Sequence, residues 1–468
     1  MEGEGRNAKR VLFHSYHFPP IGGSGAQRPL KMVRALAGLG YESTVITCGG
    51  ATSDRWAPED ASLLAEVPAS VEIRRVPHAD EPPPRIGWPG LAERWLGIEG
   101  RWARWWTDAS YRLGLEAGAG ADLIYVWMQP YVSSAAGSAL SRTLRKPWVA
   151  DLGDPWALDE MMVYPSALHQ RADLRRMRRL LGTASGIVMS TPEATRRLLA
   201  RFPELAGRPV VAIPNGFDGT DFIGKPPRRK DGKFRIVHTG YLHTELGEQH
   251  KRRGRLRLAM GGSVDGLDIG TRSHVYLVEA INRLLARDPE LEQSVELHLA
   301  GVLTEADRMV AARCPVTTLH GYMSHAESIL LMRTADILFL PMQDLPPGVR
   351  ATIIPGKTYE YLASGRPILA AVPDGDARDI LEHAANAAIV RPDDIEGIAA
   401  AIRMAFDRLR AGILPQPPDP AVVGQFEYGK LAADLAGVFD AVLDARFETR
   451  FAGPQRIRKG VRTRRNAR

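Results

Sequence analysis

The chain has few of the residues that mark disulfide-rich, metal-clustered or membrane-spanning proteins. Its 468 residues include two cysteines, Cys48 and Cys314, both in apolar settings and neither with metal-ligand spacing. Buried thiols in a reducing compartment are therefore expected. No apolar run approaches the length of a transmembrane helix, and residues 1–9 are polar where a secretory signal would be apolar. These absences predict a cytoplasmic protein and leave open a peripheral position on the cytosolic face of a membrane.

Acidic residues are missing from the C-terminal end. Residues 456–468 contain seven basic side chains and no acidic one, within a net charge of +7 for the chain. A tail at 453–468 with this composition is predicted to be disordered, and it either contacts anionic lipid or only keeps the protein in solution. A nucleic-acid partner would depend on this tail and is not expected.

Length and hydrophobic pattern predict two domains of one kind. The composition, 44% hydrophobic and 25% charged, is that of a globular protein, and 468 residues are too many for one ordinary domain. Apolar strands alternate with helical segments in both halves, which is typical of doubly wound α/β folds. Strands are predicted near 10–15, 42–48, 71–76, 123–127, 147–152, 187–190 and 209–213, then near 234–240, 295–300, 316–319, 336–341, 367–372 and 387–390. A polar linker at 219–233 separates an N-terminal domain, residues 1–222, from a C-terminal domain, residues 223–425.

Residues 353–370 contain the clearest sign of a binding site. Ile354-Pro355-Gly356 leads into a short predicted helix, where Pro355 has a suitable backbone angle and Gly356 lets a ligand approach the backbone. Lys357 and Glu360 follow one turn apart on one helix face. There a cation can meet a phosphate, and a carboxylate can accept hydrogen bonds from sugar hydroxyls. The pattern favours a nucleotide-sugar site, although two solvated side chains would look the same.

A glycine loop follows the first predicted strand. Gly22, Gly23 and Gly25 stand between that strand and a predicted helix, an order found in nucleotide-binding folds. Arg28 occupies the place of the third glycine of the dinucleotide fingerprint, so a dinucleotide is not indicated. The pattern is consistent with a loop that closes on phosphate or sugar, with His17 and Arg28 beside it. A histidine at this place can equally be structural.

Several separate motifs resemble those of family 4 glycosyltransferases, also called group 1 glycosyl transferases, of the GT-B fold. In chain order they are Pro19-Pro20-Ile21-Gly22-Gly23, Asp151-Leu152-Gly153-Asp154-Pro155-Trp156, Ile213-Pro214-Asn215-Gly216-Phe217-Asp218 and the run from Pro355 to Pro367. The second is similar to the Asp-x-x-Asp-Pro-Trp signature of one subgroup. The resemblance spans most of the chain, and four motifs in the right order are more specific than any single glycine loop.

The resemblance implies a fold and a reaction. The fold is α/β, with two doubly wound Rossmann-like domains that face an interdomain cleft, the acceptor on the N-terminal side and the donor on the C-terminal side. A last helix, 426–452, would return to the first domain. The reaction is transfer of a sugar from a nucleotide-sugar to the hydroxyl of a glycan, lipid-linked or small-molecule acceptor, with retention of anomeric configuration. No cofactor and no metal are expected, since protein cations would neutralise the diphosphate.

Site roles follow from matching positions. The catalytic candidates are Asp154, Lys357 and Arg272. Arg272 is chosen because the family's usual spacing of arginine and lysine is missing from residues 245–271. The donor is expected to contact Gly22, Gly23, Asn215, Gly240, His320, Gly321, Tyr322, Ile354, Pro355, Gly356, Lys357 and Glu360, and the acceptor or sugar side is expected to contain His17, Arg28, Asp151 and Thr352. The two aspartates end a predicted strand, where open sheets bind ligands, although Asp-Pro also starts turns.

Two positions depart from the family's pattern. Thr352 stands where the first of two glutamates is usual, and that glutamate normally meets the donor sugar. The identity of the sugar therefore stays open. Gly153 replaces the arginine of the subgroup signature.

Two further segments are unusual. Residues 245–271, rich in arginine, lysine and glycine, are predicted to form a long loop that is either functional or disordered. Residues 85–113 contain Trp88, Trp95, Trp102, Trp105 and Trp106, of which the first three recur every seventh residue and so share a helical face. Such a helix lies on a membrane or packs its aromatic rings onto the domain core.

Two other functions are compatible with the same motifs. A GT-B nucleotide-sugar epimerase would use the same fold on the same donor, and a non-catalytic GT-B partner protein would leave the donor intact. Glycan, glycolipid or natural-product biosynthesis is the expected setting of a transferase.

Overall fold

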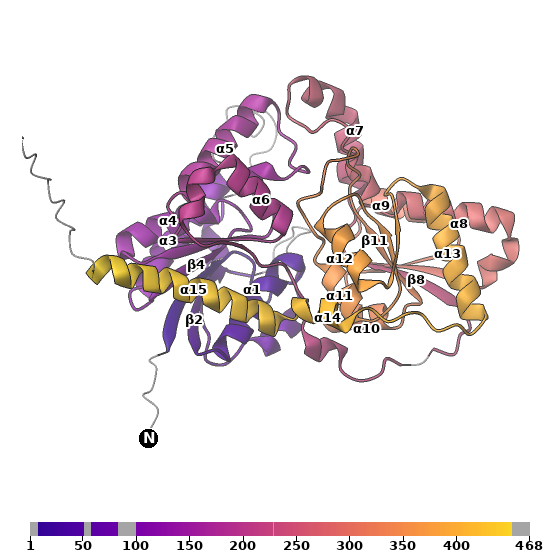
Figure 1. Ribbon diagram of the computed structural model, residues 1–468, viewed down its shortest axis with the longest axis horizontal. Coiled ribbons are helices and arrows are strands. Elements are labelled where there is room, and N and C mark those ends of the chain that lie inside the picture. Colours follow the sequence, from indigo (N-terminus) through magenta and orange to yellow (C-terminus); the bar gives the residue numbers. More distant parts are fainter. Residues whose placement is uncertain (1–7, 51–57, 83–99, 228, 452–468) are drawn as a thin grey trace, which may run out of the picture.

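The structure, a computed structural model, describes residues 8–50, 58–82, 100–227 and 229–451 (Figure 1). Trp88, Trp95 and the basic tail at 453–468 lie outside these ranges. Within the described residues the chain forms two α/β domains that lie side by side, and the last helix runs back along the first domain (Figure 1).

The first domain is a parallel sheet covered by helices. Its described strands are β1 (Lys9–Ser15), β2 (Tyr41–Cys48), β3 (Glu72–Val76), β4 (Leu123–Trp127), β5 (Trp148–Leu152), β6 (Gly186–Met189) and β7 (Val210–Ala212), and its described α-helices are α1 (Ser24–Ala37), α3 (Arg101–Ala117), α4 (Ser133–Leu144), α5 (Ala167–Leu181) and α6 (Pro192–Arg201). Strands β4, β5 and β6 are buried at every position. Continuous apolar runs suit these strands because helices cover both faces of a parallel sheet.

The second domain repeats this architecture. Its described strands are β8 (Phe234–Thr239), β9 (Val295–Ala300), β10 (Thr317–Gly321), β11 (Ile337–Pro341), β12 (Ile368–Ala371) and β13 (Ala387–Val390). Its described α-helices are α7 (Thr244–Ala259), α8 (Val275–Arg287), α9 (Glu305–Ala311), α10 (His325–Arg333), α11 (Lys357–Ala363), α12 (Asp376–Ala384), α13 (Ile395–Arg410) and α14 (Pro420–Val423), and α15 (Tyr428–Phe451) ends the described chain.

Both sheets have the doubly wound strand order. Among the described strands the first sheet runs β3-β2-β1-β4-β5-β6-β7 and the second β10-β9-β8-β11-β12-β13, with parallel pairing throughout. The order reverses between β1 and β4 and between β8 and β11, and ligands of such sheets bind outside the carboxyl ends of the strands at these points. The prediction of two doubly wound Rossmann-like domains is confirmed.

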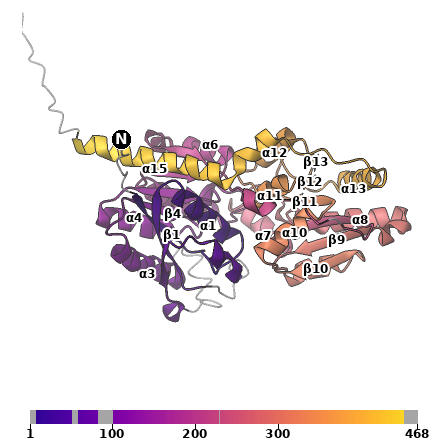
Figure 2. The ribbon, with the colours of Figure 1, turned by 90° about the horizontal axis from the view of Figure 1, so that it is seen from below.

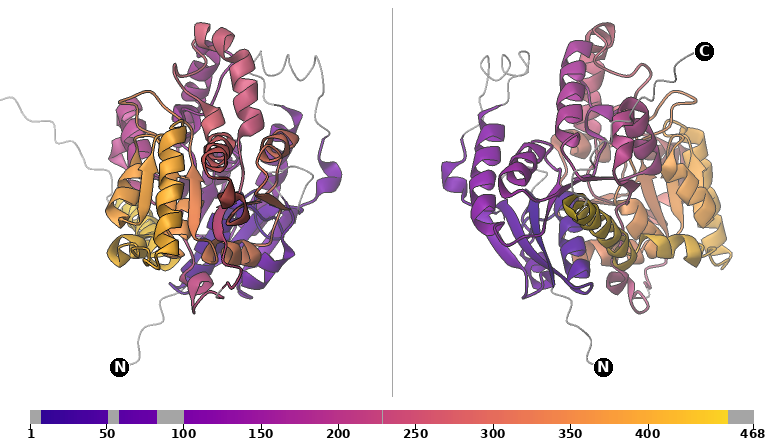
Figure 3. Two further views of the ribbon diagram at one scale, coloured as in Figure 1. Left: turned by 90° about the vertical axis from the view of Figure 1, so that its right-hand side faces the viewer. Right: turned by 60° about the vertical axis from the view of Figure 1, so that its left-hand side comes forward.

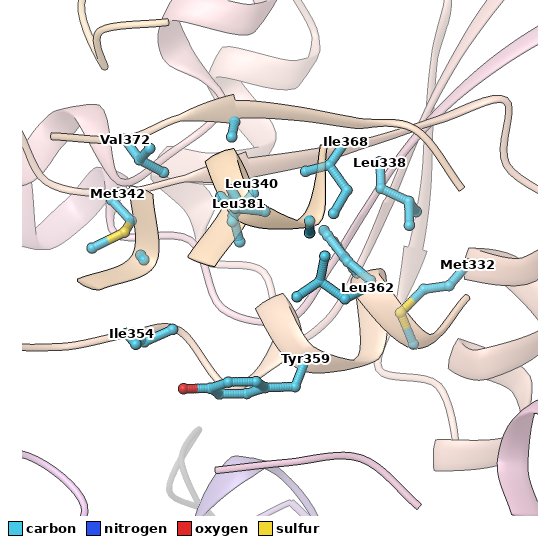
Figure 4. Close-up of a cluster of buried hydrophobic side chains, with 14 of the residues drawn as sticks. Met332, Leu338, Leu340, Met342, Ile354, Tyr359, Leu362, Ile368, Val372 and Leu381 are labelled. Atoms are coloured by element: carbon cyan, nitrogen blue, oxygen red, sulfur yellow. The ribbon is translucent and has the colours of Figure 1, made fainter. Parts of the chain in front are cut away.

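The core of the second domain fixes the segment that the sequence marks as a binding site. Figure 4 shows Leu338, Leu340, Ile368 and Leu381 of the central strands and α12 packed with Ile354, Tyr359 and Leu362. Tyr359 and Leu362 are each 1% exposed. Burial of each such side chain contributes roughly 1.5–3 kcal/mol. One face of α11 is thus anchored in the core, while Lys357 and Glu360 lie on its less buried side.

The last helix joins the domains. Where the chain crosses back, Phe217 donates its amide to the carbonyl of Phe426, and Tyr428 donates to Phe217. Helix α15 then lies along the first domain (Figure 2). Its buried side chains Leu431, Leu435, Val438, Phe439 and Val442 pack in the same cluster as Phe13 of β1 and Tyr125 of β4.

The prediction of a loop over 245–271 is wrong for its first half, which forms α7. Glutamate, glutamine, lysine, arginine and leucine dominate that stretch, and their helix propensity outweighs its glycines. The residues that follow α7 meet the start of α5 of the first domain, at the end of the molecule that lies uppermost in Figure 3. The amides of Tyr164 and Ala167 there donate to the carbonyls of Gly262 and Met260 across the domain boundary.

The tryptophans of α3 pack inward. Trp106 is fully buried and donates from Nε1 to Ser133 Oγ at 2.9 Å, and Trp102 donates from Nε1 to Glu81 at 3.0 Å. Both rings lie edge-on against Tyr16. Of the two interpretations of this segment, packing onto the domain core applies to these described residues. No described helix combines the length and apolarity needed to cross a membrane.

One ion pair lies inside the first domain. Arg28 of α1 donates from Nε and Nη2 to Asp151 Oδ2 at 3.0 and 2.9 Å, and the two side chains are 1% and 0% exposed. Tyr125 donates to the same oxygen at 2.5 Å. Burial raises the pKa of Asp151, and the charge of Arg28 opposes that effect. Arg28 also donates to the carbonyls of Ile213 and Pro214, so the pair ties α1 to β5 and to the loop after β7.

Leu435→Ala should destabilise the first domain by about 2–5 kcal/mol, because it leaves a cavity where α15 packs on the sheet. The exposed neighbour variant Asp434→Ala is the matched control and should behave like wild type. Urea denaturation, monitored by the amide exchange of β1 and β4, measures the loss of stability. Equal stability of the two variants would show that α15 does not support this domain.

Asp151→Ala should cost about 3–5 kcal/mol of unfolding free energy, because it leaves the Arg28 guanidinium buried without its counter-charge. Glu204→Ala, which breaks an exposed pair with Arg178, should leave the denaturation midpoint near that of wild type. Chemical denaturation of both variants provides the comparison. A loss no larger for Asp151→Ala than for Glu204→Ala contradicts the assigned role.

Candidate active site at the domain boundary

Loops at the carboxyl ends of both sheets meet where the domains touch. Tyr322, which follows β10, donates its hydroxyl to Asp60 Oδ2 at 3.4 Å. Thr191, which follows β6, donates to the carbonyl of Thr352 at 2.7 Å. The strand ends that bind ligands in doubly wound sheets therefore adjoin one shared boundary.

The glycine loop of the first domain lies against the second domain. Gly23 precedes α1 with φ of 77°, a left-handed conformation that favours glycine. A Cβ atom at Gly22 would lie 2.2 Å from Tyr322 Oη and 2.8 Å from Asp60 Cβ, so no side chain fits there. The backbone of this loop thus borders the boundary directly.

Three glycines leave bare backbone at the strand ends of the second domain. Gly240, Gly301 and Gly321 follow or end β8, β9 and β10 with φ of 109°, 143° and 72°. A Cβ at Gly301 would lie 2.3 Å from the carbonyl oxygen of Gly240, and a Cβ at Gly240 would lie 2.8 Å from Lys357 Nζ. Gly240 and Gly321 are predicted donor residues, whereas Gly301 carries no sequence signal of its own.

Lys357 places a cation beside this backbone. Its Nζ lies 3.2 Å from Nε2 of His238, a β8 residue. Burial and the charge of Arg272 lower the pKa of Lys357 to about 7, against an opposing effect of Glu360. Burial and the charge of Lys357 also hold the pKa of His238 well below its usual value. Lys357 and Arg272 are thus neighbouring cations, and an anion bound beside them would relieve their repulsion.

Three carboxylates of the first domain face Arg272. Burial lowers the pKa of the guanidinium, and the charges of Asp154, Asp159 and Glu160 raise it. Burial raises the pKa of Asp154, and burial together with the charge of Asp154 holds the pKa of Asp159 well above its usual value. The structure therefore groups Asp154, Arg272 and Lys357, the three catalytic candidates from the sequence.

A tryptophan fixes the loop that carries these carboxylates. Trp156 has φ of 50°, in the left-handed region that costs a bulky residue energy. Its ring stacks on Tyr131 at 5.2 Å, and its Nε1 donates to Asp173 at 3.0 Å. These contacts hold the strained backbone between Asp154 and Asp159.

Glu360 lies in a second charged group. His325 at the start of α10 bonds through Nε2 to Asp221 at 2.9 Å, and this bond together with the charge of Glu360 raises the pKa of His325 against the effect of its burial. Burial raises the pKa of Glu360, while the positive charges of His325 and Lys357 lower it. Among the described residues none donates a hydrogen bond to the Glu360 carboxylate, so its oxygens can accept from a ligand.

Four other predicted donor residues lie at or near the start of α11. Asn215 Nδ2 would be 3.9 Å from a Cβ at Gly356, which brings the loop after β7 to this point. Pro355 and Gly356 accept hydrogen bonds from the amides of Thr358 and Tyr359. Ile354 belongs to the core of the second domain and is 8% exposed.

Several predicted side chains are engaged elsewhere. His320 stacks on His298 of β9, with Nε2 2.8 Å from His298 Nδ1, so its side chain is directed to the outer strands. His17 lies against the start of α1, where a Cβ at Gly25 would be 3.0 Å from its Nδ1. Arg28 and Asp151 are buried in their ion pair, so a direct contact of either with an acceptor has no geometric support.

The two departures from the family pattern have structural counterparts. A Cβ at Gly153 would lie 2.5 Å from the Trp127 ring, so the arginine of the subgroup signature has no room here. Thr352, the position without its glutamate, is fully buried and donates from its amide and its hydroxyl to Glu160 of the first domain, at 3.0 and 2.5 Å.

Sequence reasoning missed Asp159, Glu160, His325 and Asp221. The first two follow the Asp-Pro-Trp motif within a few residues, and only that position could have suggested them. Asp374 and Asp376 form an Asp-x-Asp triplet, but they pair with Arg378 and Arg350. Among the described residues no group of three or more histidine, cysteine, aspartate or glutamate side chains has the geometry of a metal site.

Two family models match the chain. Residues 23–216 match a glycosyl transferase 4-like domain, and residues 267–408 match the model described as glycosyl transferases group 1. The matches fall on the first and second domains in turn. No curated protein shows significant sequence similarity to the chain.

Solved structures share the two-domain fold at low identity. HepE from Anabaena, solved with UDP and glucose, is 15% identical over 92% of this chain and 99% of its own, with a TM-score of 0.58. Sucrose-phosphate synthase from Thermosynechococcus elongatus is 16% identical over 94% and 98%, with a TM-score of 0.56. A putative UDP-N-acetylglucosamine 2-epimerase from Listeria monocytogenes is 14% identical over 94% and 97%, with a TM-score of 0.53.

At these identities the structural likeness establishes the fold, while the family models establish what kind of domain occupies each half. The strand order, the loops at the shared boundary and the two matches agree. The chain is a GT-B glycosyltransferase of the group 1 and family 4-like type.

Proposed function

We propose that the protein transfers a sugar from a nucleotide-sugar donor to an acceptor hydroxyl, with the donor diphosphate held at Lys357 and Arg272. The observation that carries this proposal is the pair of neighbouring cations beside bare glycine backbone at the strand ends of the second domain. Crystal structures of HepE with UDP and glucose and with UDP-glucose support this class of ligand.

The other donor contacts follow from this placement. Glu360, one helical turn from Lys357, accepts hydrogen bonds from the ribose hydroxyls. The base lies against the backbone near Gly321 and Tyr322, where a Cβ at Gly321 would meet no atom within 4 Å. The backbone at Gly22 and Gly23 approaches the donor from the first domain.

Catalysis depends on charge that develops as the diphosphate leaves. The bond between the anomeric carbon and the diphosphate oxygen breaks, and negative charge grows on that oxygen. The acceptor oxygen bonds to the anomeric carbon, and its proton passes to the departing diphosphate. Preorganised cations and amides in a water-poor site stabilise this charge strongly, and Lys357 and Arg272 supply the cations. Asp154, opposite Arg272, accepts a hydrogen bond from the acceptor hydroxyl and orients it. Retention of configuration and membership of the Asp-x-x-Asp-Pro-Trp subgroup are carried over from the family resemblance.

The acceptor and its location complete the proposal. The acceptor is a glycan, a lipid-linked sugar or a small molecule in glycan, glycolipid or natural-product biosynthesis, and the protein works in the cytoplasm without a cofactor or metal. Because Trp106 is buried, peripheral attachment to a membrane would need other parts of the 85–113 segment or the basic tail.

A GT-B epimerase is the rival activity, and the putative epimerase from Listeria monocytogenes shares the fold. Product analysis separates the two. A transferase releases nucleoside diphosphate from the donor only when an acceptor is present. An epimerase forms a rearranged nucleotide-sugar when no acceptor is present. The family models favour the transferase.

A thermal-shift screen against UDP-, GDP- and dTDP-sugars tests the donor site. At a concentration 100 times Kd the matching donor should stabilise the protein by about 2.7 kcal/mol, a shift of a few degrees in Tm. Glu360→Ala and Lys357→Met should abolish most of this shift. The matched variants Glu382→Ala and Lys430→Met, at exposed positions, should keep it. If no nucleotide-sugar raises the Tm of the wild-type protein, the proposed function is wrong.

Donor affinity should fall as pH rises above about 7. The pKa of Lys357 is about 7 in the free protein, and a bound diphosphate anion raises it, so binding takes up a proton once the free lysine has lost its own. Kd should therefore increase by about tenfold per pH unit above this value, until pH reaches the raised pKa of the complex. Calorimetry with UDP-glucose at pH 6, 7 and 8 measures the trend. Lys357→Met should flatten it, and an equally steep trend in that variant would assign the titration to another group.

A further inference from the structure

Thr352 has all its polar groups bonded to the opposite domain. Its amide and its hydroxyl donate to Glu160, at 3.0 and 2.5 Å, and its carbonyl accepts from Thr191 at 2.7 Å. Glu160 and Thr191 follow β5 and β6 of the first domain, whereas Thr352 belongs to the second. Such complete satisfaction across a boundary specifies one relative position of the two segments.

Thr352 also lies in the same chain segment, residues 352–357, as the proposed diphosphate-binding residues; this segment is called the donor loop below. Thr352 stands two residues before Ile354-Pro355-Gly356 and five before Lys357. Ile353 and Ile354, between Thr352 and the helix, are 5% and 8% exposed, so this stretch is packed rather than loose. A shift of Thr352 would therefore be passed to the backbone and the ammonium that hold the diphosphate.

The Glu160 carboxylate is saturated by protein donors. Oε1 accepts from Gln343 Nε2 at 3.1 Å as well as from the amide of Thr352, and Oε2 lies 3.6 Å from Arg197 Nη1. The side chain of Glu160 is 1% exposed. A carboxylate with these partners acts on its neighbours more than on a ligand, which distinguishes Glu160 from Glu360.

We propose that Glu160 is a positioning residue that sets the donor loop through Thr352, so that the first domain completes the diphosphate site of the second. The family pattern has a glutamate at position 352. In this chain the residue there is Thr352, and the carboxylate beside it is that of Glu160 from the opposite domain. Glu160 does not touch the donor; it holds the 352–357 segment in the arrangement that binds it. This inference rests on the proposed function for its effect on the donor but not for the contact itself.

Four variants of the full-length protein test the proposal. Glu160→Gln keeps the shape and removes the charge, Thr352→Val removes one donor, and the third combines both. Glu193→Gln is the matched control, because Glu193 is a buried carboxylate on α6 that also pairs with Arg197 but makes no bond to Thr352. Thermal melting establishes that each variant is folded before it is compared.

The first measurement is amide exchange in the protein without ligand. Exchange of residues 352–357 should accelerate in Glu160→Gln and in Thr352→Val. It should match wild type in Glu193→Gln, because Arg350, the partner of Glu193 nearest to this segment, lies before it. Unchanged exchange in Glu160→Gln, or equal acceleration in the control, overturns the proposal. Because no ligand is present, this measurement tests the role of Glu160 even if UDP-glucose is not a donor.

The second measurement is the Kd for UDP-glucose. Glu160→Gln should weaken binding by about 10- to 100-fold, as small misplacements of binding groups do. Because both residues act through one contact, the double variant should be no weaker than Glu160→Gln within about twofold, and Glu193→Gln should bind like wild type. Additive losses overturn the coupling through Thr352. Failure of the wild-type protein to bind any nucleotide-sugar counts against the proposed function instead.

Discussion

Repulsion between like charges at the domain boundary is the constraint on which the site depends. Lys357 and Arg272 lie close enough for one to lower the pKa of the other, in surroundings where burial already disfavours both charges. Asp154, Asp159 and Glu160 of the first domain supply the opposing charge. The second domain thus provides cations and the first provides carboxylates, so that neither domain alone sets the electrostatic state of the site.

Packing turns this electrostatic arrangement into a defined geometry. One face of α11 is buried with Tyr359 and Leu362, and the preceding loop is held from the first domain at Thr352. The opposite loop is fixed by the stacked Trp156 and its bond to Asp173. Binding groups held on both sides by rigid neighbours need little reorganisation when a charged ligand arrives, which favours stabilisation of developing charge.

The positions that depart from the family pattern are matched by partners distant in the sequence. At Gly153 the Trp127 ring occupies the space of a side chain, and at Thr352 the carboxylate comes from Glu160. In both cases the substitution is local but its counterpart belongs to another strand or to the other domain. The effect of a changed motif residue in this fold therefore depends on the element that packs against it, as well as on its neighbours in the sequence.

The sequence by itself determined the fold and the helix that contains Lys357 and Glu360. Strands at 123–127 and 295–300 were predicted with the bounds they have, because the first is a continuous apolar run and the second alternates apolar with polar residues. Lys357 and Glu360 share a face because helix periodicity is local. The glycines of residues 245–271 led to the wrong prediction of a loop where α7 begins, although the other residues of α7 favour a helix. Only the tertiary structure paired Arg28 with Asp151 inside the core and brought Glu160 to Thr352. Those contacts join loops without a repeating pattern, and their partners are decided by how the sheets and domains pack.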